Sequence, residues 1–140
     1  MPALPIVLLV DDDDTTNFLN VRLLRHLDAA VQVLTALNGR EALALLRSHG
    51  QPPSPRCPVL VFLDINMPVM DGFEFLQAYQ QLPLAQQHGM VIVMLTTSVS
   101  PRDLTRLQDL PIAGFLSKPL TEEKVAQVLA DYFPPIPAAP

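Results

Sequence analysis

Five short apolar runs recur at regular intervals along the chain, and their spacing constrains the fold more than any other feature. Several of the runs are rich in Val and Ile, and the third and fourth are almost continuously apolar, as expected of strands that are buried on both faces. We therefore predict five strands, at residues 5–10, 31–36, 58–63, 90–95 and 112–116.

Helical periodicity fills the gaps between these runs. The first predicted helix starts at Thr15, and its apolar positions 21, 23, 24 and 27 share one face. Capping residues mark the starts of the other four: Asn38 with Glu41, Asp71, Ser100 before Pro101, and Thr121. Gly50 is the predicted stop of the second helix. Five strands alternating with five helices predict a doubly wound α/β domain, whose parallel sheet is covered by helices on both faces.

Composition narrows the class of protein. Hydrophobic residues make up 49% and charged residues 16%, which argues against a disordered chain. No apolar run is long enough to span a bilayer and the N-terminus lacks the pattern of a signal peptide, so we expect a cytoplasmic protein without membrane contacts. Cys57 is the single cysteine, which excludes an intrachain disulfide. The net charge of −5 and the scattered Lys and Arg argue against direct nucleic-acid binding.

Prolines cluster at two places, residues 52–58 and residues 134–140. We interpret the first cluster as a lengthened loop and the second as an extended tail. The predicted organisation is therefore one domain over residues 1–133, followed by a proline-rich tail over residues 134–140.

Polar side chains gather at the predicted carboxyl ends of four strands. These residues are Asp11 and Asp12, Asp64, Thr96 and Lys118. In doubly wound sheets, ligands bind at this edge, near the point where the strand order reverses. Three carboxylates suit Mg²⁺, which prefers oxygen ligands, and a carboxylate can attack phosphorus to form an acyl phosphate. Lys118 and Thr96 could then hold the phosphoryl oxygens.

Two electrostatic consequences follow from this cluster. Without a metal, Asp11, Asp12 and Asp64 repel one another, so at least one of them should have a raised pKa. We also expect the ammonium of Lys118 to pair with Asp64 before any phosphoryl group arrives.

The simpler interpretation of any one of these residues is structural. A single aspartate at a strand end more often caps a turn or helix, and Asp13, Asp14 and Asp71 fit that role. The three histidines, His26, His49 and His88, have no ligand spacing around them. Capping does not account for the joint pattern on four strand ends.

Four stretches of the sequence resemble the receiver domains of bacterial two-component response regulators. They are LLVDDD at 8–13, VFLDINMPVMDG at 61–72, MLTTS at 94–98 and GFLSKP at 114–119. The resemblance covers about residues 4–133 and implies a flavodoxin-like sheet with strand order 2-1-3-4-5. It also implies a stand-alone, single-domain regulator, although a receiver excised from a longer protein remains open.

The resemblance implies a role for each site residue. Asp64 is the expected phosphoacceptor, and its donor is a phosphohistidine on a histidine kinase or a histidine phosphotransfer protein. Mg²⁺ is the expected cofactor, bound by Asp11, Asp12, Asp64 and the backbone carbonyl of Asn66. Thr96 and Lys118 are expected to contact the phosphoryl oxygens. The peptide bond between Lys118 and Pro119 is expected to be cis.

The resemblance also implies how a signal leaves the site. Thr96 and Phe115 are the expected switch residues, and the surface from Pro101 to Tyr132 is where we expect a downstream protein or a second copy of the chain to bind. The protein is then a signalling domain that catalyses only its own phosphorylation and dephosphorylation. Phe115 as a fixed core aromatic is the alternative at that position.

Two other functions are alternatives to this one. A phosphatase of the haloacid dehalogenase type is suggested by Asp11-x-Asp13-x-Thr15 after an apolar strand. That type of phosphatase requires an acidic pair after a further strand, and this sequence has no such pair beyond Lys118. The phosphatase interpretation also leaves Asp64 unexplained. A degenerate receiver used only as a scaffold is disfavoured because every signature residue is present.

Overall fold

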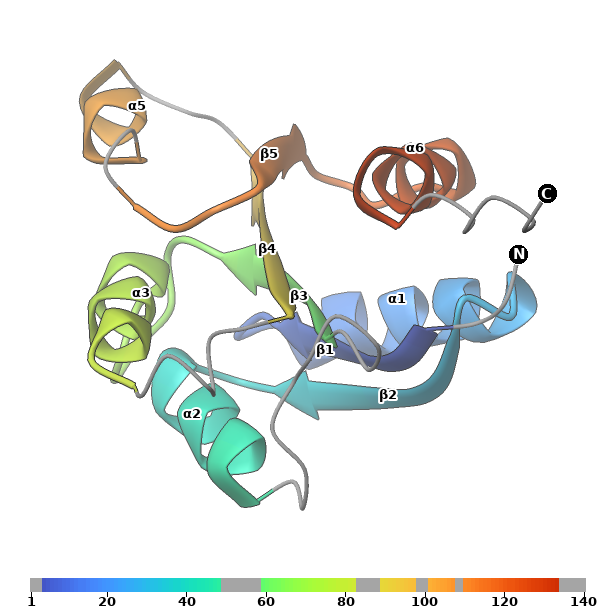
Figure 1. Cartoon of the computed structure of the whole chain (residues 1–140), viewed down its shortest axis with the longest axis horizontal. Helices are drawn as coiled ribbons and strands as arrows, with labels where there is room; N and C mark the ends of the chain where they lie inside the picture. The colour runs from blue at the N-terminus through green and yellow to red at the C-terminus, as the bar shows by residue number, and fades with distance from the viewer. Residues whose placement is uncertain (1–3, 49–58, 83–88, 98–100, 108–109, 134–140) are drawn as a thin grey trace, which may run out of the picture.

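The computed structural model describes residues 4–48, 59–82, 89–97, 101–107 and 110–133, and in this part of the chain strands and helices alternate (Figure 1). The strands are β1 (Leu4–Val10), β2 (Ala30–Ala36), β3 (Val59–Asp64), β4 (Met90–Thr96) and β5 (Gly114–Ser117). The helices are α1 (Asp14–His26), α2 (Gly39–Ser48), α3 (Gly72–Gln80), α5 (Pro101–Leu107) and α6 (Glu122–Tyr132).

The five strands form one parallel sheet in the order β2-β1-β3-β4-β5, which confirms the predicted fold class and topology. Four strands begin within a residue of their predicted starts. β5 begins two residues later, at Gly114, where the paired register with β4 starts. The Ile112 amide turns back to the Leu110 carbonyl, and the Ala113 amide already reaches β4 at the Ile92 carbonyl.

The register of the sheet aligns the carboxyl ends of its strands. Val10 pairs with Leu63, and the last residue of β4, Thr96, pairs with Ser117. Because all the strands are parallel, the residues that end or follow them meet at one edge. The strand order reverses between β1 and β3, and this is where doubly wound sheets bind ligands.

Each face of the sheet has its own apolar core, and successive residues of β1 alternate between them. Leu8 and Val10 lie in the core that α2 and α3 cover, whereas Val7 and Leu9 lie in the core that α1 and α6 cover. Figure 1 shows these two helix pairs on opposite sides of the sheet. All six residues of β3 are buried, which explains its continuous apolar sequence.

Local capping sets the helix starts as predicted. Asp13 caps α1 by accepting from the amides of Thr15 and Thr16, at 2.9 and 3.4 Å. Asp71 and Glu74 form a reciprocal capping box at α3, with bonds of 2.8 and 3.3 Å. The Asn38–Glu41 pair differs in one detail, because the Glu41 carboxylate accepts from the amide of Leu37 instead of Asn38.

Several predictions fall on residues that the structure does not describe. The helix stop at Gly50, the cap at Ser100, the proline-rich loop at 52–58 and the tail at 134–140 lie outside the described residues. The domain boundary at residue 133 therefore stays a prediction. No helix within the described ranges has both the length and the apolar character needed to cross a membrane.

Candidate functional site

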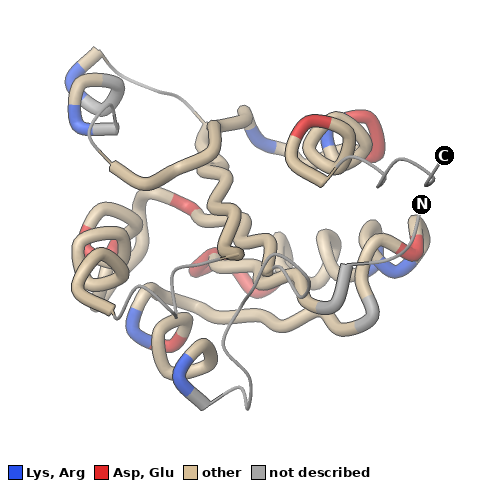
Figure 2. Tube along the Cα trace, viewed as in Figure 1, with Lys and Arg blue, Asp and Glu red and all other residues tan. Residues whose placement is uncertain are grey.

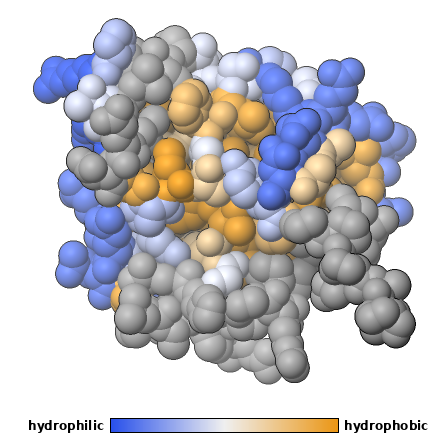
Figure 3. Space-filling model, turned by 45° about the horizontal axis from the view of Figure 1, so that its top comes forward, coloured by the Kyte–Doolittle hydropathy of each residue, from blue (hydrophilic) through white to orange (hydrophobic). Residues whose placement is uncertain are grey.

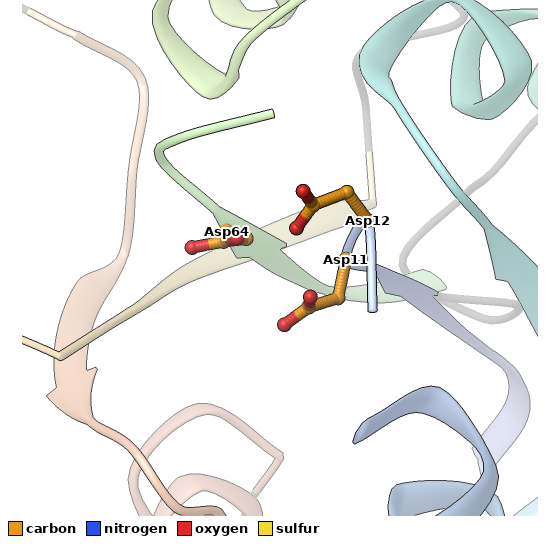
Figure 4. Close-up of side chains that lie close together, drawn as sticks. All are labelled: Asp11, Asp12 and Asp64. Atoms are coloured by element: carbon orange, nitrogen blue, oxygen red, sulfur yellow. The ribbon is translucent and has the colours of Figure 1, made fainter. Parts of the chain in front are cut away.

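Three carboxylates converge at the carboxyl ends of β1 and β3. Asp11 and Asp64 are buried, with 4% and 8% of their surface exposed, whereas Asp12 is exposed. One oxygen from each carboxylate lies within 4.8 Å of the other two. Figure 4 shows the three side chains extending into the same space beyond the strand ends. The structure thus brings together the acidic residues that the sequence singled out.

Asp11 is held in place by contacts on several of its polar groups. Its amide donates to the Ala36 carbonyl at 3.1 Å, and its own carbonyl accepts from Nδ2 of the buried Asn17 at 2.9 Å. Its Oδ1 accepts from the amide of Asp13 at 2.9 Å. The remaining oxygen, Oδ2, is directed at Lys118.

Lys118 reaches both buried carboxylates. Its Nζ lies 2.6 Å from Oδ2 of Asp11 and 3.3 Å from Oδ1 of Asp64. The predicted pair with Asp64 is therefore present, but the shorter contact is with Asp11. The Lys118 amide donates to the Thr96 carbonyl at 2.8 Å, and the Lys118–Pro119 peptide is cis as expected.

The charges of the site shift two pKa values. Burial raises the pKa of Asp64, the nearby negative charge of Asp11 adds to this, and Lys118 opposes it. Burial alone would lower the pKa of Lys118, but its bond to Asp11 and the charges of both carboxylates outweigh burial and raise it. The expected raised pKa is thus confirmed for Asp64, although burial contributes more to it than the carboxylate repulsion we had invoked.

The donor set fits Mg²⁺. Carboxylate oxygens are the hard ligands that this ion prefers. One oxygen each from Asp11, Asp12 and Asp64 lies within 4.8 Å of the other two, so these three carboxylates could hold one ion together. Asn66 is exposed two residues beyond Asp64, and its carbonyl as a ligand stays a prediction.

Thr96 and Phe115 occupy neighbouring strands beside this cluster. Thr96 ends β4 and is 4% exposed, and Phe115 of β5 pairs in register with Met94. Side chains two residues apart on a strand share a face, so Thr96 and Phe115 are diagonal neighbours on one side of the sheet. Phe115 is 48% exposed, which excludes the alternative that it is a fixed core aromatic in this structure.

Gly72 allows the loop after β3 to lie directly against the backbone of Asp64. Its amide donates to the Ile65 carbonyl at 2.8 Å, and a Cβ atom at this position would lie 2.5 Å from the backbone oxygen of Asp64. The loop geometry around Asp64 therefore requires a residue without a side chain at position 72.

Two polar residues near the site were not singled out from the sequence. Asn17 bridges the ends of β1 and β2 through the carbonyls of Asp11 and Ala36, at 2.9 and 3.4 Å. Lys124 of α6 binds the segment that carries Lys118, with its Nζ 2.7 Å from the Ser117 carbonyl. The sequence could have indicated Asn17, because it is a polar residue on the sheet-facing side of an amphipathic helix.

The comparisons with known proteins agree with this geometry. Residues 7–130 match the response regulator receiver domain family. The chain belongs to this family. The receiver is 28% identical over 113 residues to the response regulator Rcp1 of Synechocystis, which covers 81% of this chain and 76% of Rcp1. It superposes on the chemotaxis protein CheY4 of Vibrio cholerae with a TM-score of 0.72, at 33% identity, covering 91% of this chain and 97% of that chain.

Other relatives contain a similar segment within a much longer protein. The receiver is 29% identical to part of the peroxide stress-activated histidine kinase mak3 of Schizosaccharomyces pombe, and it spans 5% of that protein. Receiver domains are phosphoacceptor signalling domains rather than classical enzymes, and histidine kinases phosphorylate them. The acidic pocket of Asp11, Asp12 and Asp64 is consistent with such an acceptor site.

The phosphatase alternative fails on the structure as well as on family membership. That alternative needs Asp13 to face the reacting group, but the Asp13 carboxylate caps α1, and bonds from the amides of Thr15 and Thr16 lower its pKa. Asp64, which the phosphatase leaves without a role, is one of the three carboxylates of the cluster.

Proposed function

We propose that this receiver accepts a phosphoryl group on Asp64, from a phosphohistidine of a histidine kinase or a histidine phosphotransfer protein, in a Mg²⁺-dependent reaction. The observation that carries the proposal is the placement of Asp64: a buried carboxylate, 3.3 Å from an ammonium and next to two further carboxylates at one sheet edge. The sequence has a single cysteine, Cys57, and the proposed source of the phosphoryl group is a histidine kinase. Both favour action in the cytoplasm.

In the transfer step, a carboxylate oxygen of Asp64 attacks phosphorus while the bond from phosphorus to the imidazole nitrogen breaks. The electron pair of that bond stays on the imidazole. Lys118 would exchange part of its contact with Asp11 for a phosphoryl oxygen, and the Thr96 hydroxyl would bind another. Mg²⁺, held by Asp11, Asp12, Asp64 and the Asn66 carbonyl, would offset the negative charge that gathers there. Water later attacks the acyl phosphate and restores the Asp64 carboxylate.

A protein donor suits the surface beside the site. Phe18 and Leu19 of α1 are 60% and 54% exposed, and Leu19 lines a groove of about 270 Å³ that continues to Lys118 and Pro119. Lys and Arg of the described chain are spread over several elements and form no single stripe (Figure 2), which supports a protein partner over nucleic acid.

The signal would leave through α5, β5 and α6. Bonding of Thr96 to the phosphoryl group would vacate space at the end of β4, and Phe115 would turn inward to fill it. Figure 3, in which the top of Figure 1 comes forward, shows apolar surface at the centre of this face. Among the residues of these elements, Phe115 and Tyr132 are exposed large hydrophobic residues. Either a downstream protein or a second copy of the phosphorylated receiver could cover such surface.

The test is phosphorylation by acetyl phosphate, read by intact mass. We expect the wild type to gain one phosphoryl group with Mg²⁺ and none with EDTA, and Asp64→Asn to gain none. Asp13→Asn is the matched control, since asparagine also caps helices and Asp13 lies outside the acidic cluster. Labelling of Asp64→Asn to the wild-type extent would exclude Asp64 as the acceptor, and steady hydrolysis of a generic phosphate ester would favour the phosphatase.

The switch is tested separately by amide NMR shifts with and without beryllofluoride, a phosphoryl mimic. We expect shifts at Phe115 and along α6 as well as around Asp64. Shifts confined to the surroundings of Asp64 would leave the acceptor standing and exclude the switch.

A further inference from the structure

Lys124 uses all of its ammonium protons on one short segment of the chain. Its Nζ donates to the Ser117 carbonyl at 2.7 Å, to the Pro119 carbonyl at 2.9 Å and to the Ser117 hydroxyl at 3.3 Å. A lysine ammonium has three donors, so these contacts satisfy it completely. The two carbonyls belong to the residues on either side of Lys118, and the peptide between Lys118 and Pro119 is cis.

The position of Lys124 is unfavourable for a cation by local rules. It lies in the first turn of α6, where the helix dipole favours negative side chains. Glu122 and Glu123 precede it, yet within the described residues Lys124 forms no ion pair with either and binds backbone carbonyls instead. Side chains that violate a local preference are expected at functional sites.

The segment is anchored on its other side as well. The Lys118 amide donates to the Thr96 carbonyl at 2.8 Å, so the backbone of Lys118 is held by β4 through its amide and by Lys124 through the flanking carbonyls. The Lys118 side chain then leaves a fixed backbone and reaches Asp11 and Asp64. Only two lysines occur in the whole chain, and the second one holds the first in place.

We propose that Lys124 is a positioning residue for Lys118. Its ammonium clamps the Ser117–Pro119 segment so that the Lys118 ammonium is directed at the acceptor carboxylate. The expected consequence, tighter binding of a phosphoryl group, rests on the proposed function. The order of the Lys118 side chain does not depend on phosphorylation.

The first measurement is side-chain NMR of protein labelled with ¹³C at lysine Cε. In Lys124→Met, Lys118 is the only lysine, so its resonance stands alone. We expect the order parameter of the Lys118 Cε group to fall in Lys124→Met. It should be retained in Lys124→Arg, whose guanidinium offers several donors to the same carbonyls. Gln127→Met is the control, because it removes a different side-chain bond of α6, to Asp131 at 2.8 Å.

The second measurement is the affinity for beryllofluoride with saturating Mg²⁺, in a double-mutant cycle with Lys118→Met. We expect Lys124→Met to weaken binding about fivefold in the wild-type background, as loss of orientation does, and to have no effect once Lys118 is absent. A purely structural contact of Lys124 would weaken binding equally in both backgrounds.

The two measurements separate the two proposals. If wild-type protein takes up neither a phosphoryl group nor beryllofluoride, the proposed function fails, and the order parameter of Lys118 still decides the clamp. An unchanged order parameter in Lys124→Met overturns the positioning role, as does an equal loss of affinity with and without Lys118.

Discussion

Replacing Lys118 with Met should destabilise the metal-free receiver and make its stability depend strongly on Mg²⁺. The substitution keeps the length of the side chain but removes the cation that lies 2.6 Å from Asp11 and 3.3 Å from Asp64. Both carboxylates remain buried, so each loses its counter-charge without gaining access to water.

The magnitude follows from these distances. With an effective dielectric constant of about 20, the two contacts amount to about 6 and about 5 kcal/mol of attraction. Desolvation of the three groups offsets most of this, and removing one partner of a buried pair costs about 3–5 kcal/mol. Because 19% of the Lys118 side chain is exposed, we expect a loss near the lower end, about 3 kcal/mol. For a domain of this size, this lowers the Tm by roughly 6–10 °C.

Mg²⁺ should reverse most of this loss. The ion supplies the missing positive charge, and in the variant it no longer competes with an ammonium for Asp11. A ligand at a free concentration of a hundred times its Kd stabilises a fold by about 2.7 kcal/mol. Because the variant should bind Mg²⁺ more tightly, it should gain more stability from a given Mg²⁺ concentration than the wild type does.

The assay is thermal unfolding in EDTA and across a Mg²⁺ titration, with Arg22→Met as the control. Arg22 is an exposed cation whose guanidinium lies 5.9 Å from the Phe18 ring centroid, so its loss should change the Tm little. If metal-free Lys118→Met melts within about 2 °C of the wild type, or if Mg²⁺ stabilises the wild type more than the variant, the electrostatic reasoning is wrong.

Three further predictions concern the acceptor and its loop. The raised pKa of Asp64 means that the folded state holds its proton to higher pH than the unfolded state, so metal-free stability should fall as pH rises through the carboxyl range above 3.8. Urea unfolding from pH 4 to 7 should show this fall, and Asp64→Asn should reduce it; an equal slope in both proteins would contradict the assignment. Gly72→Ala should cost about 2–4 kcal/mol in urea unfolding, because its Cβ would lie 2.5 Å from the Asp64 backbone oxygen; since helix propensity alone favours alanine, a loss below about 1 kcal/mol would show that the loop moves freely. Asp71→Ala should lose about 1 kcal/mol with the capping box, whereas Asp71→Asn should lose less, and equal losses would mean that the cap is not the cause.

Much of the fold was predictable because its signals are local. A capping box such as Asp71–Glu74 needs only residues three apart, and a buried strand such as β3 needs only a run of apolar residues. Parallel strands then bring their ends to one edge whatever the details of packing, so the cluster of Asp11, Asp12 and Asp64 was predictable too. The start of β5 was misplaced because the Ile112 amide bonds back to Leu110 instead of to β4, and residue type does not record this.

The sequence by itself determined the element order, the helix caps and which residues meet at the sheet edge. Only the tertiary structure decided that Lys118 lies closer to Asp11 than to Asp64, that burial contributes most to the raised pKa of Asp64, and that Phe115 is half exposed. It also assigned Lys124 to the carbonyls around Lys118. The first of these is a difference of less than an ångström between two contacts of Lys118. All of them depend on how separate elements pack, and Lys118 and Asp11 are 107 residues apart in the chain. Hydrophobic periodicity and capping patterns act over a few residues, so they specify which elements form and leave such distances to packing.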